Sequence, residues 1–302
     1  MSLVSIVIPT HNRLAMLENA VASVFAQTYE NWELLITSDG SSDGTNEYLK
    51  KLSQNPKVKV FFNEKPSGAS SARNLALTHA SGSFIAFLDD DDVWMPEKLA
   101  IQVPMLVASD DKVGLVYAWM EYYRDGKLDK KHSPTLEGDV YPEMLWRQAI
   151  GGCPTIIIKS EVVEKVGLFN EKLLRGNDGD YWRRISKHYH VICCRQFLAK
   201  INIGHDDRIS ENNINNLLKV EYAFKERLKT FEEDFARFPE ARFRHNLKIV
   251  ETYLLMGEFV KALQYFFGTA WGSLSPRKSL MISLSQGKRL LSCALQSRSV
   301  RR

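Results

Sequence analysis

Residues 84–94 read Phe-Ile-Ala-Phe-Leu-Asp-Asp-Asp-Asp-Val-Trp, an apolar run that passes directly into four consecutive carboxylates. Neighbouring carboxylates repel one another, and a solvated surface turn does not need four of them after a buried strand. A hard divalent cation does need clustered oxygen ligands, and it often takes further oxygens from a phosphorylated substrate. The stretch therefore favours a cation site at a strand end over the alternative of a solvated acidic turn.

The first hundred residues alternate between short apolar runs and segments with helical spacing. This alternation predicts strands over 4–8, 32–37, 58–62 and 84–88, with helices over 14–27, near 45–49 and over 68–80. Near-continuous apolar strands separated by helices indicate an α/β fold with a parallel sheet buried on both faces. Ligands of such sheets bind beyond the carboxyl ends of the strands, where the acidic run lies.

The second half of the chain changes character near Ser210. Strand-like runs recur at 115–117, 155–158 and 191–194, with helical stretches near 141–148 and 180–187. Beyond Ser210 only helices are expected, over 212–236, 241–256 and 258–271, with breaks at Pro239 and Gly257. We therefore place a change of architecture at about residue 210.

Composition excludes several classes of protein. The 302 residues are 44% hydrophobic and 25% charged, which is typical of a globular domain. The net charge is +4, but residues 277–302 hold seven basic and no acidic residues, so residues 1–276 carry −3. That is not the basic body of a nucleic-acid binder. The four cysteines form no CxxC pair and are expected to be free thiols in a reducing compartment.

Four motifs follow one another in the first hundred residues. The first is an opening strand and turn, the second an Asp-Gly turn, the third a helix start and the fourth the acidic run with its flanking Trp, Pro and Leu. In this sequence they are Val4 to Arg13, Ser38 to Thr45, Gly68 to Asn74, and Leu88 to Trp94 with Pro96 and Leu99. In this order they resemble glycosyltransferase family 2, whose members have the GT-A fold. The resemblance is strong over residues 2–110, fair over 150–210 and weak beyond.

The resemblance implies a role for each matching residue in binding a nucleotide-sugar donor. Asp91 would ligate a divalent cation, Mn²⁺ or Mg²⁺. The implied donor-binding residues are Pro9 and His11 at the base, Asp39 as hydrogen-bond acceptor of a uracil ring, Arg73 near the diphosphate, and Asp89 and Asp90 on the ribose side. The sequence departs from the family at Ser38, where an Asp is usual, and at His11, where Tyr is more common. His11 as a plain helix-entry residue is an equal alternative.

Two later segments also resemble the family. Residues 176–184 resemble its acidic segment at a helix start, which makes Asp178 the implied general base and Asp180 the weaker alternative. A carboxylate at that position can also be a simple helix cap. Residues 204–210 resemble a late His-to-Ser segment, in which His205 would complete the metal shell and Arg208 would approach the diphosphate.

The resemblance implies a GT-A domain over residues 1–210 and a helical region with a basic tail over 211–302. Residues 1–110 would form the nucleotide-binding half and 111–210 the acceptor half. No signal-peptide pattern and no apolar stretch of roughly 18–20 residues is found, so a cytoplasmic protein is expected. Leu280, Leu284, Leu291 and Leu295 give the tail an amphipathic pattern, which fits either contact with the inner membrane surface or a solvated helix.

The expected function is inverting, metal-dependent sugar transfer from a nucleotide-sugar to an acceptor hydroxyl. The donor is expected to be a UDP-sugar and the acceptor a glycan or glycolipid of surface polysaccharide synthesis. The alternative is a catalytically inactive sugar-nucleotide-binding or scaffold protein. A nicotinamide dehydrogenase and a P-loop enzyme are disfavoured because neither glycine-rich fingerprint is present.

Overall fold

The computed structural model describes residues 1–204, 213–270, 290, 292 and 293. The described chain divides into two compact units. The first contains Met1–Val140, Ala149–Lys172 and the chain from Asn177 to the last strand. The second contains Tyr141–Gln148, Leu173–Gly176 and the C-terminal helices. The predicted boundary at 210, His205, Arg208 and nearly all of the basic tail lie outside the described residues, so these expectations stay predictions.

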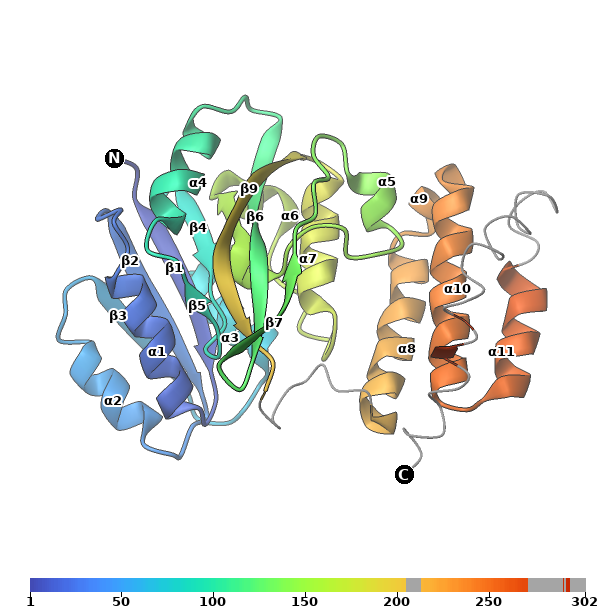
Figure 1. Cartoon of the computed structure of the whole chain (residues 1–302), viewed down its shortest axis with the longest axis horizontal. Helices are drawn as coiled ribbons and strands as arrows, with labels where there is room; N and C mark the ends of the chain where they lie inside the picture. The colour runs from blue at the N-terminus through green and yellow to red at the C-terminus, as the bar shows by residue number, and fades with distance from the viewer. Residues whose placement is uncertain (205–212, 271–289, 291, 294–302) are drawn as a thin grey trace. The chain divides into compact units, whose positions relative to one another are not determined.

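The first unit is built on one mixed sheet (Figure 1). Its central strands run in the order β3-β2-β1-β4-β8-β6-β9-β5, and β7 pairs with β6 at the side. The strands are β1 Val4–Thr10, β2 Trp32–Asp39, β3 Val58–Asn63, β4 Phe84–Phe87, β5 Val93–Trp94, β6 Val113–Arg124, β7 Lys127–His132, β8 Ile156–Lys159 and β9 His190–Asn202.

The four N-terminal strands are parallel, as the sequence predicts. The sheet is mixed beyond them, because β8 runs antiparallel to both β4 and β6. β1 and β2 are buried along their whole length, which explains their unbroken apolar runs. The α/β fold class is therefore confirmed, on a mixed sheet in which the β6–β9 pair is also parallel and the pairs made by β8, β5 and β7 are antiparallel.

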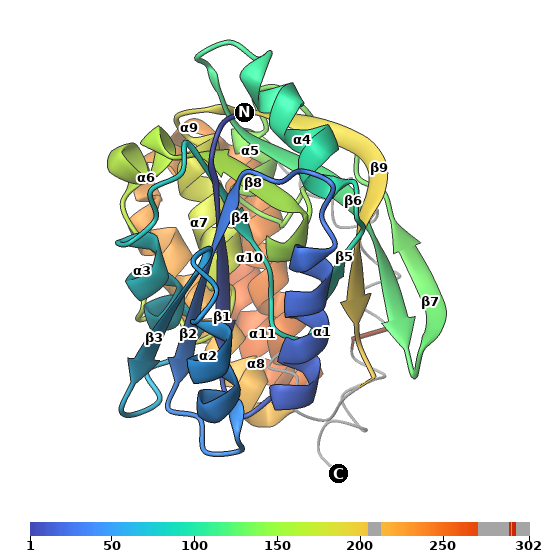
Figure 2. The same ribbon diagram turned by 90° about the vertical axis from the view of Figure 1, so that its left-hand side faces the viewer.

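Helices cover both faces of this sheet. α1 Leu14–Phe25 and α4 Lys98–Val107 share one apolar core with alternate residues of β1, β2 and β4. α3 Ala69–Leu77 packs on β1 and β2 (Figure 2). The aromatic rings of α7 Asn177–Ser186 pack on Phe87 of β4. Two short helices, α2 Thr45–Leu52 and α6 Glu161–Val166, and the 3₁₀ turn η1 Cys153–Thr155 complete the unit.

The β6–β7 hairpin was missed by the sequence analysis, which predicted a strand only over 115–117. β7 is exposed at every position and mostly charged, so it lacks an apolar pattern. The available signal was its turn, because Asp125 and Gly126 both have positive φ, the conformation that an Asp-Gly hairpin turn requires.

The second unit is helical, as predicted. Its helices are α5 Tyr141–Met144, α8 Ile214–Thr230, α9 Glu232–Arg237, α10 Pro239–Leu255 and α11 Phe259–Tyr265, followed by a π-helical turn, η2 Phe266–Ala270. α10 packs against both α8 and α11. Pro239 begins α10, where its missing N–H costs no hydrogen bond, and the predicted helix 212–236 is interrupted at Phe231.

Candidate functional site

The carboxyl ends of β1 and β4 meet at the acidic run. β1 pairs with β2 on one side and β4 on the other, so the chain connections diverge at this point of the sheet. The Thr10 hydroxyl, at the end of β1, donates a 2.8 Å hydrogen bond to Asp90 Oδ2. The edge that parallel-sheet topology marks as a ligand site is thus the one that carries the carboxylates.

Arg13 ties the first turn to this run. Its Nη1 donates to Asp90 Oδ1 at 3.0 Å and to Asp91 Oδ2 at 3.1 Å. Burial raises the pKa of Asp90; Arg13 opposes this shift and the charge of Asp91 adds to it. Sequence reasoning gave Arg13 no role, although a basic residue immediately after the first turn was a usable signal.

Three carboxylates of the run could hold a cation together. Asp89, Asp91 and Asp92 each offer an oxygen, and these oxygens lie within 4.8 Å of one another. An all-carboxylate set is the donor chemistry that Mg²⁺ and Mn²⁺ prefer, so these residues fit a divalent cation. The sequence assigned Asp91 to the metal and Asp89 to the donor, and it gave Asp92 no role. The predicted further ligand, His205, lies outside the described residues.

Asp92 is held in place by the last strand of the sheet. Its Oδ1 accepts a hydrogen bond from the backbone N–H of Asn202 at 3.0 Å, and the Asn202 side chain donates to the Asp91 carbonyl oxygen at 2.6 Å. β9 therefore fixes the acidic run from the side opposite to Thr10 and Arg13.

Arg73 and Asp178 face the same carboxylates from two helices. Arg73, on α3, is 6% exposed and its Nη2 lies 2.5 Å from Asp89 Oδ1. Its Nε has no hydrogen-bond partner among the described residues, so this guanidinium keeps an unused donor. Asp178 lies in the first turn of α7, where its charge interacts with those of Arg73 and Asp89. Residues 73, 89 and 178, far apart in sequence, thus form one electrostatic cluster.

The pKa of Asp178 is shifted in the direction opposite to the one that its position at a helix N-terminus would give. A helix N-terminus favours an ionised carboxylate, and Asp178 Oδ1 does accept a 2.7 Å hydrogen bond from the Gly179 N–H. Burial nevertheless dominates and raises the pKa of Asp178 overall. The shift suits proton transfer, since a base works best when its pKa lies near the working pH.

Asp180 has a different environment. Its Oδ2 forms a 2.9 Å ion pair with Arg184, one turn along the helix. Arg184 also donates to the carbonyl oxygens of Val166 and Leu168, which anchors α7 to the end of α6. Asp180 is therefore engaged in a structural contact, whereas the charge of Asp178 interacts with those of Arg73 and Asp89.

The residues predicted to bind the base gather at the ends of β1 and β2. The Asp39 carboxylate accepts hydrogen bonds from the Asn63 side chain, from Ser67 and from the Gly68 N–H. Burial would raise the pKa of Asp39, but these donors together lower it. Gly68 has φ +95°, a left-handed conformation that directs its N–H to Asp39 at low strain.

His11 and Pro9 lie beside this loop. His11 is exposed, and its Nδ1 lies 2.6 Å from the Asp39 carbonyl oxygen, which fixes the ring orientation. Pro9 is buried within β1. The structure thus brings Asp39 and His11 together. Their roles towards a base stay predictions.

Cys153 was given no functional role by the sequence. It begins η1 and is 3% exposed. Burial raises the pKa of its thiol well above the ordinary value; Arg73 opposes this, whereas Asp89, Asp178 and Asp92 add to it. The thiol is therefore held neutral, and the charges of the cluster act on it. Its neighbours in sequence, Gly152 and Pro154, carry no chemical signal that would have placed it there.

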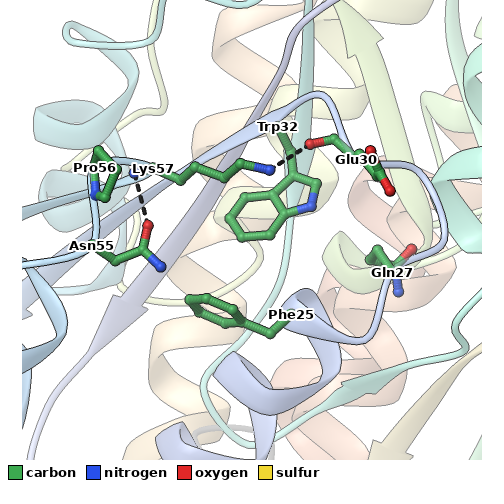
Figure 3. Close-up of a pocket in the computed structure, with 7 residues that line it drawn as sticks. All are labelled: Phe25, Gln27, Glu30, Trp32, Asn55, Pro56 and Lys57. Atoms are coloured by element: carbon green, nitrogen blue, oxygen red, sulfur yellow. Dashed lines mark hydrogen bonds between the residues drawn. The ribbon is translucent and has the colours of Figure 1, made fainter.

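The opposite edge of the sheet has a shallow pocket of about 550 Å³ (Figure 3). It is lined by Phe25, Gln27, Glu30, Trp32, Asn55, Pro56 and Lys57. Trp32 begins β2, so this pocket lies at the amino ends of the parallel strands. None of its lining residues belongs to the acidic run or to the Arg73–Asp178 cluster, and it is not the candidate site.

Comparisons with known proteins agree with this geometry. The family model "Glycosyl transferase family 2" matches residues 5–167. A UDP-Glc:alpha-D-GlcNAc-diphosphoundecaprenol beta-1,3-glucosyltransferase, WfgD of Escherichia coli, is 30% identical over 87% of this chain and 96% of its own length. A putative teichuronic acid biosynthesis glycosyltransferase, TuaG of Bacillus subtilis, is 30% identical over 74% of this chain and 88% of its own.

Solved structures show the same fold at low sequence identity. S. aureus TarS residues 1–349, in complex with UDP-GlcNAc, has a TM-score of 0.63 at 17% identity, covering 87% of this chain and 81% of its own. The mannosyltransferase PcManGT from Pyrobaculum calidifontis, in complex with GDP-Man and Mn²⁺, has a TM-score of 0.63 at 17% identity, covering 98% and 84%. The sheet is thus that of a GT-A glycosyltransferase, and the chain belongs to glycosyl transferase family 2.

Proposed function

We propose that this glycosyltransferase transfers a sugar from a UDP-sugar to an acceptor hydroxyl with inversion, in the presence of a divalent cation. The observation that carries the proposal is the cluster at the carboxyl edge, in which Asp89, Asp91 and Asp92 converge beside Arg73 and Asp178. The remaining assignments, Pro9, His11, Asp39 and Asp90 around the donor, follow from the family resemblance.

The leaving group of this reaction is a nucleoside diphosphate, which gains negative charge as the sugar departs. A divalent cation held by Asp89, Asp91 and Asp92 would supply charge neutralisation there. Arg73 supports the same role, since its guanidinium is buried at the carboxylates and keeps a free Nε–H donor among the described residues. In this proposal the Arg73 guanidinium, now paired with Asp89, would also contact the diphosphate.

Asp178 is proposed to accept the proton of the acceptor hydroxyl. Single displacement with inversion needs one base on the acceptor side and no carboxylate nucleophile. The raised pKa of Asp178 and its separation from the acidic run in sequence support this assignment. Asp180 is the less suitable candidate because Arg184 engages it.

The acceptor is proposed to be a growing glycan on a lipid carrier. The relative WfgD is named for a diphosphoundecaprenol acceptor and TuaG for teichuronic acid biosynthesis, which supports the setting of surface polysaccharide synthesis. Such acceptors lie in a membrane, and a cytoplasmic enzyme would reach them by peripheral contact. Within residues 1–204 and 213–270, no helix has the length and hydrophobicity to cross a bilayer.

The experiment combines binding and turnover. Nucleotide-sugars are screened for thermal stabilisation with and without Mn²⁺, because a ligand that binds only the folded state raises the melting temperature. We expect UDP-sugars to stabilise the protein in a metal-dependent way and one of them to be hydrolysed slowly. Donor binding without transfer or hydrolysis would favour the alternative of a catalytically inactive sugar-nucleotide-binding protein.

A further inference from the structure

The second unit exposes an unusual share of large apolar side chains. Fourteen such side chains are exposed in the described structure, and seven of them lie within residues 213–270. Three are on α8, and the other four are Phe259, Val260, Leu263 and Phe267 on α11 and the turn that follows. Contiguous apolar surface of this kind marks a contact site, whereas scattered single residues do not.

The four residues of the α11 group share one face. At about 100° per residue, positions 259, 260, 263 and 267 fall within an arc of about 100°. α11 lies beside α10 (Figure 1). Ala262 of α11 is 2% exposed and packs with Ile249, Val250 and Tyr253 of α10, so another face of α11 is buried. We call Phe259, Val260, Leu263 and Phe267 the α11 stripe. Their side chains are 47–68% exposed, so they are not part of the face by which α11 packs on α10.

The charge of the sequence that follows Glu258 is one-sided. From Phe259 to Arg302 the chain has eight basic residues and no acidic residue, and one of the eight, Lys261, pairs with Glu258 at 3.6 Å. Two copies of this stretch brought together in a symmetric dimer would place like charges side by side, which is unfavourable. An anionic surface satisfies both features, because basic residues are attracted to it and apolar or aromatic side chains enter its interfacial layer.

We propose that the α11 stripe is the docking face by which the enzyme binds an anionic lipid bilayer. Phe259, Leu263 and Phe267 enter the boundary between headgroups and acyl chains, while the basic stretch supplies attraction to the headgroups. The inference rests on the proposed function in one respect, since a lipid-linked acceptor lies in the same membrane. Docking would raise the concentration of acceptor at the enzyme without changing the chemistry at the acidic run.

The test compares the full chain with Leu263→Glu and with Val107→Glu in co-sedimentation with vesicles. Leu263 and Val107 are 59% and 61% exposed, so the two variants add the same charge at equally exposed positions, on α11 and at the end of α4. The vesicles contain phosphatidylglycerol and phosphatidylcholine, or phosphatidylcholine alone, at low and high salt. Circular dichroism checks that each variant is folded, and Leu263→Gln repeats the test without added charge.

We expect the wild type to bind the anionic vesicles, Leu263→Glu to lower the partition constant about tenfold or more, and Val107→Glu to change it less than twofold. Leu263→Gln should fall between them. Binding to the vesicles should weaken with salt, because salt screens the attraction of the basic residues to the headgroups. The binding that remains at high salt should come from the apolar contact, and Leu263→Glu should abolish it. All four proteins should hydrolyse the donor at the same rate, so a failure of the transferase proposal can be distinguished from a failure of the docking proposal.

Three results would overturn the inference. The first is a wild-type chain that does not bind anionic vesicles at low salt. The second is equal binding by wild type and Leu263→Glu, which would leave the basic stretch as the whole attachment. The third is a wild-type dimer that Leu263→Glu converts to a monomer, because the stripe would then be covered by a second copy.

Discussion

Buried carboxylates lie at both edges of the central sheet, and the pKa of Glu33 at the amino edge is shifted in the opposite direction to those of Asp90 and Asp178 at the carboxyl edge. At the amino edge, Glu33 accepts hydrogen bonds from Ser5, from both the N–H and the hydroxyl of Ser81, and from Lys59, at 2.6–2.8 Å. Burial would raise the pKa of Glu33, but these donors outweigh it and lower the pKa to about 2. This carboxylate is stabilised in its ionised form and has a structural role.

At the carboxyl edge Asp39 behaves like Glu33, because its hydrogen-bond donors lower its pKa, but for two other carboxylates the balance is reversed. Burial raises the pKa of both Asp90 and Asp178, and the hydrogen bonds that they accept do not compensate. Arg73 retains an unused Nε there among the described residues. Unfavourable charge of this kind is typical of functional sites, so the direction of the pKa shift distinguishes Asp90 and Asp178 from the structural carboxylate Glu33.

The largest expected effect comes from Asp178→Asn. An amide cannot accept the acceptor proton, and loss of a general base costs about 10²–10⁴ in rate. We expect kcat to fall by that order, with UDP and Mn²⁺ affinity nearly unchanged and residual product still inverted. Steady-state kinetics and calorimetry measure these quantities. Asp180→Asn is the matched control, and wild-type turnover in Asp178→Asn together with its loss in Asp180→Asn would exchange the two roles.

The pH profile sharpens the same comparison. Because Asp178 must be ionised to act, kcat/KM should fall as the pH drops through its raised pKa. The acid limb should therefore lie above the value of about 3.9 for an ordinary Asp. The limb should be absent from the residual activity of Asp178→Asn. An acid limb at the ordinary value would contradict the environment assigned to Asp178.

Asp91→Asn tests the cation site at the same edge. The change removes one anionic ligand and nearly preserves the shape, so we expect the Mn²⁺-dependent part of donor affinity to fall about tenfold or more. The fold should be retained, as circular dichroism would report. Asp111→Asn, an exposed acid before β6, is the control. Unchanged metal dependence in Asp91→Asn would remove this residue from the site.

Glu33→Gln should affect stability and spare activity. The neutral amide loses charge-assisted hydrogen bonds, so we expect the free energy of unfolding at neutral pH to fall by about 2 kcal/mol. Because the folded pKa of about 2 lies below the unfolded value, this stability is present above about pH 4.5 and is lost as the pH falls towards 2. Denaturant unfolding at several pH values measures it, with the exposed Glu47→Gln as control. A variant as stable as wild type would mean that the amino edge is not held by Glu33.

The smallest expected effect is the preference between pyrimidine bases. Uracil N3–H is a donor and cytosine N3 is an acceptor, so a carboxylate at Asp39 should favour UDP over CDP by about tenfold. Ser67 and Gly68 already use much of the acceptor capacity of Asp39, which limits this preference. Calorimetry with both nucleotides decides, and equal affinities would assign Asp39 to holding the loop alone.

The features that could be predicted from the sequence are those that depend on neighbouring residues. The buried strands β1, β2 and β4 appear as apolar runs, and the acidic run follows β4 directly, so the edge of the sheet that carries the site could be named. The exposed strand β7 could not be predicted, because a charged edge strand has no apolar period. The roles of Arg13 and Asp92 could not be predicted either, because contacts between distant residues leave no local pattern in the sequence.

The sequence by itself determined the family, the α/β alternation and the types of residue at the strand ends, because hydrophobic period and motif spacing are properties of neighbouring residues. Only the tertiary structure showed that Asp180 pairs with Arg184 whereas the charge of Asp178 interacts with those of Arg73 and Asp89, that the charge of Arg73 acts on Cys153, and that Asp89 groups with Asp92. The physical reason is that burial and the fields of distant charges depend on which surfaces meet in space. Two acids separated by one residue can therefore have different chemistry.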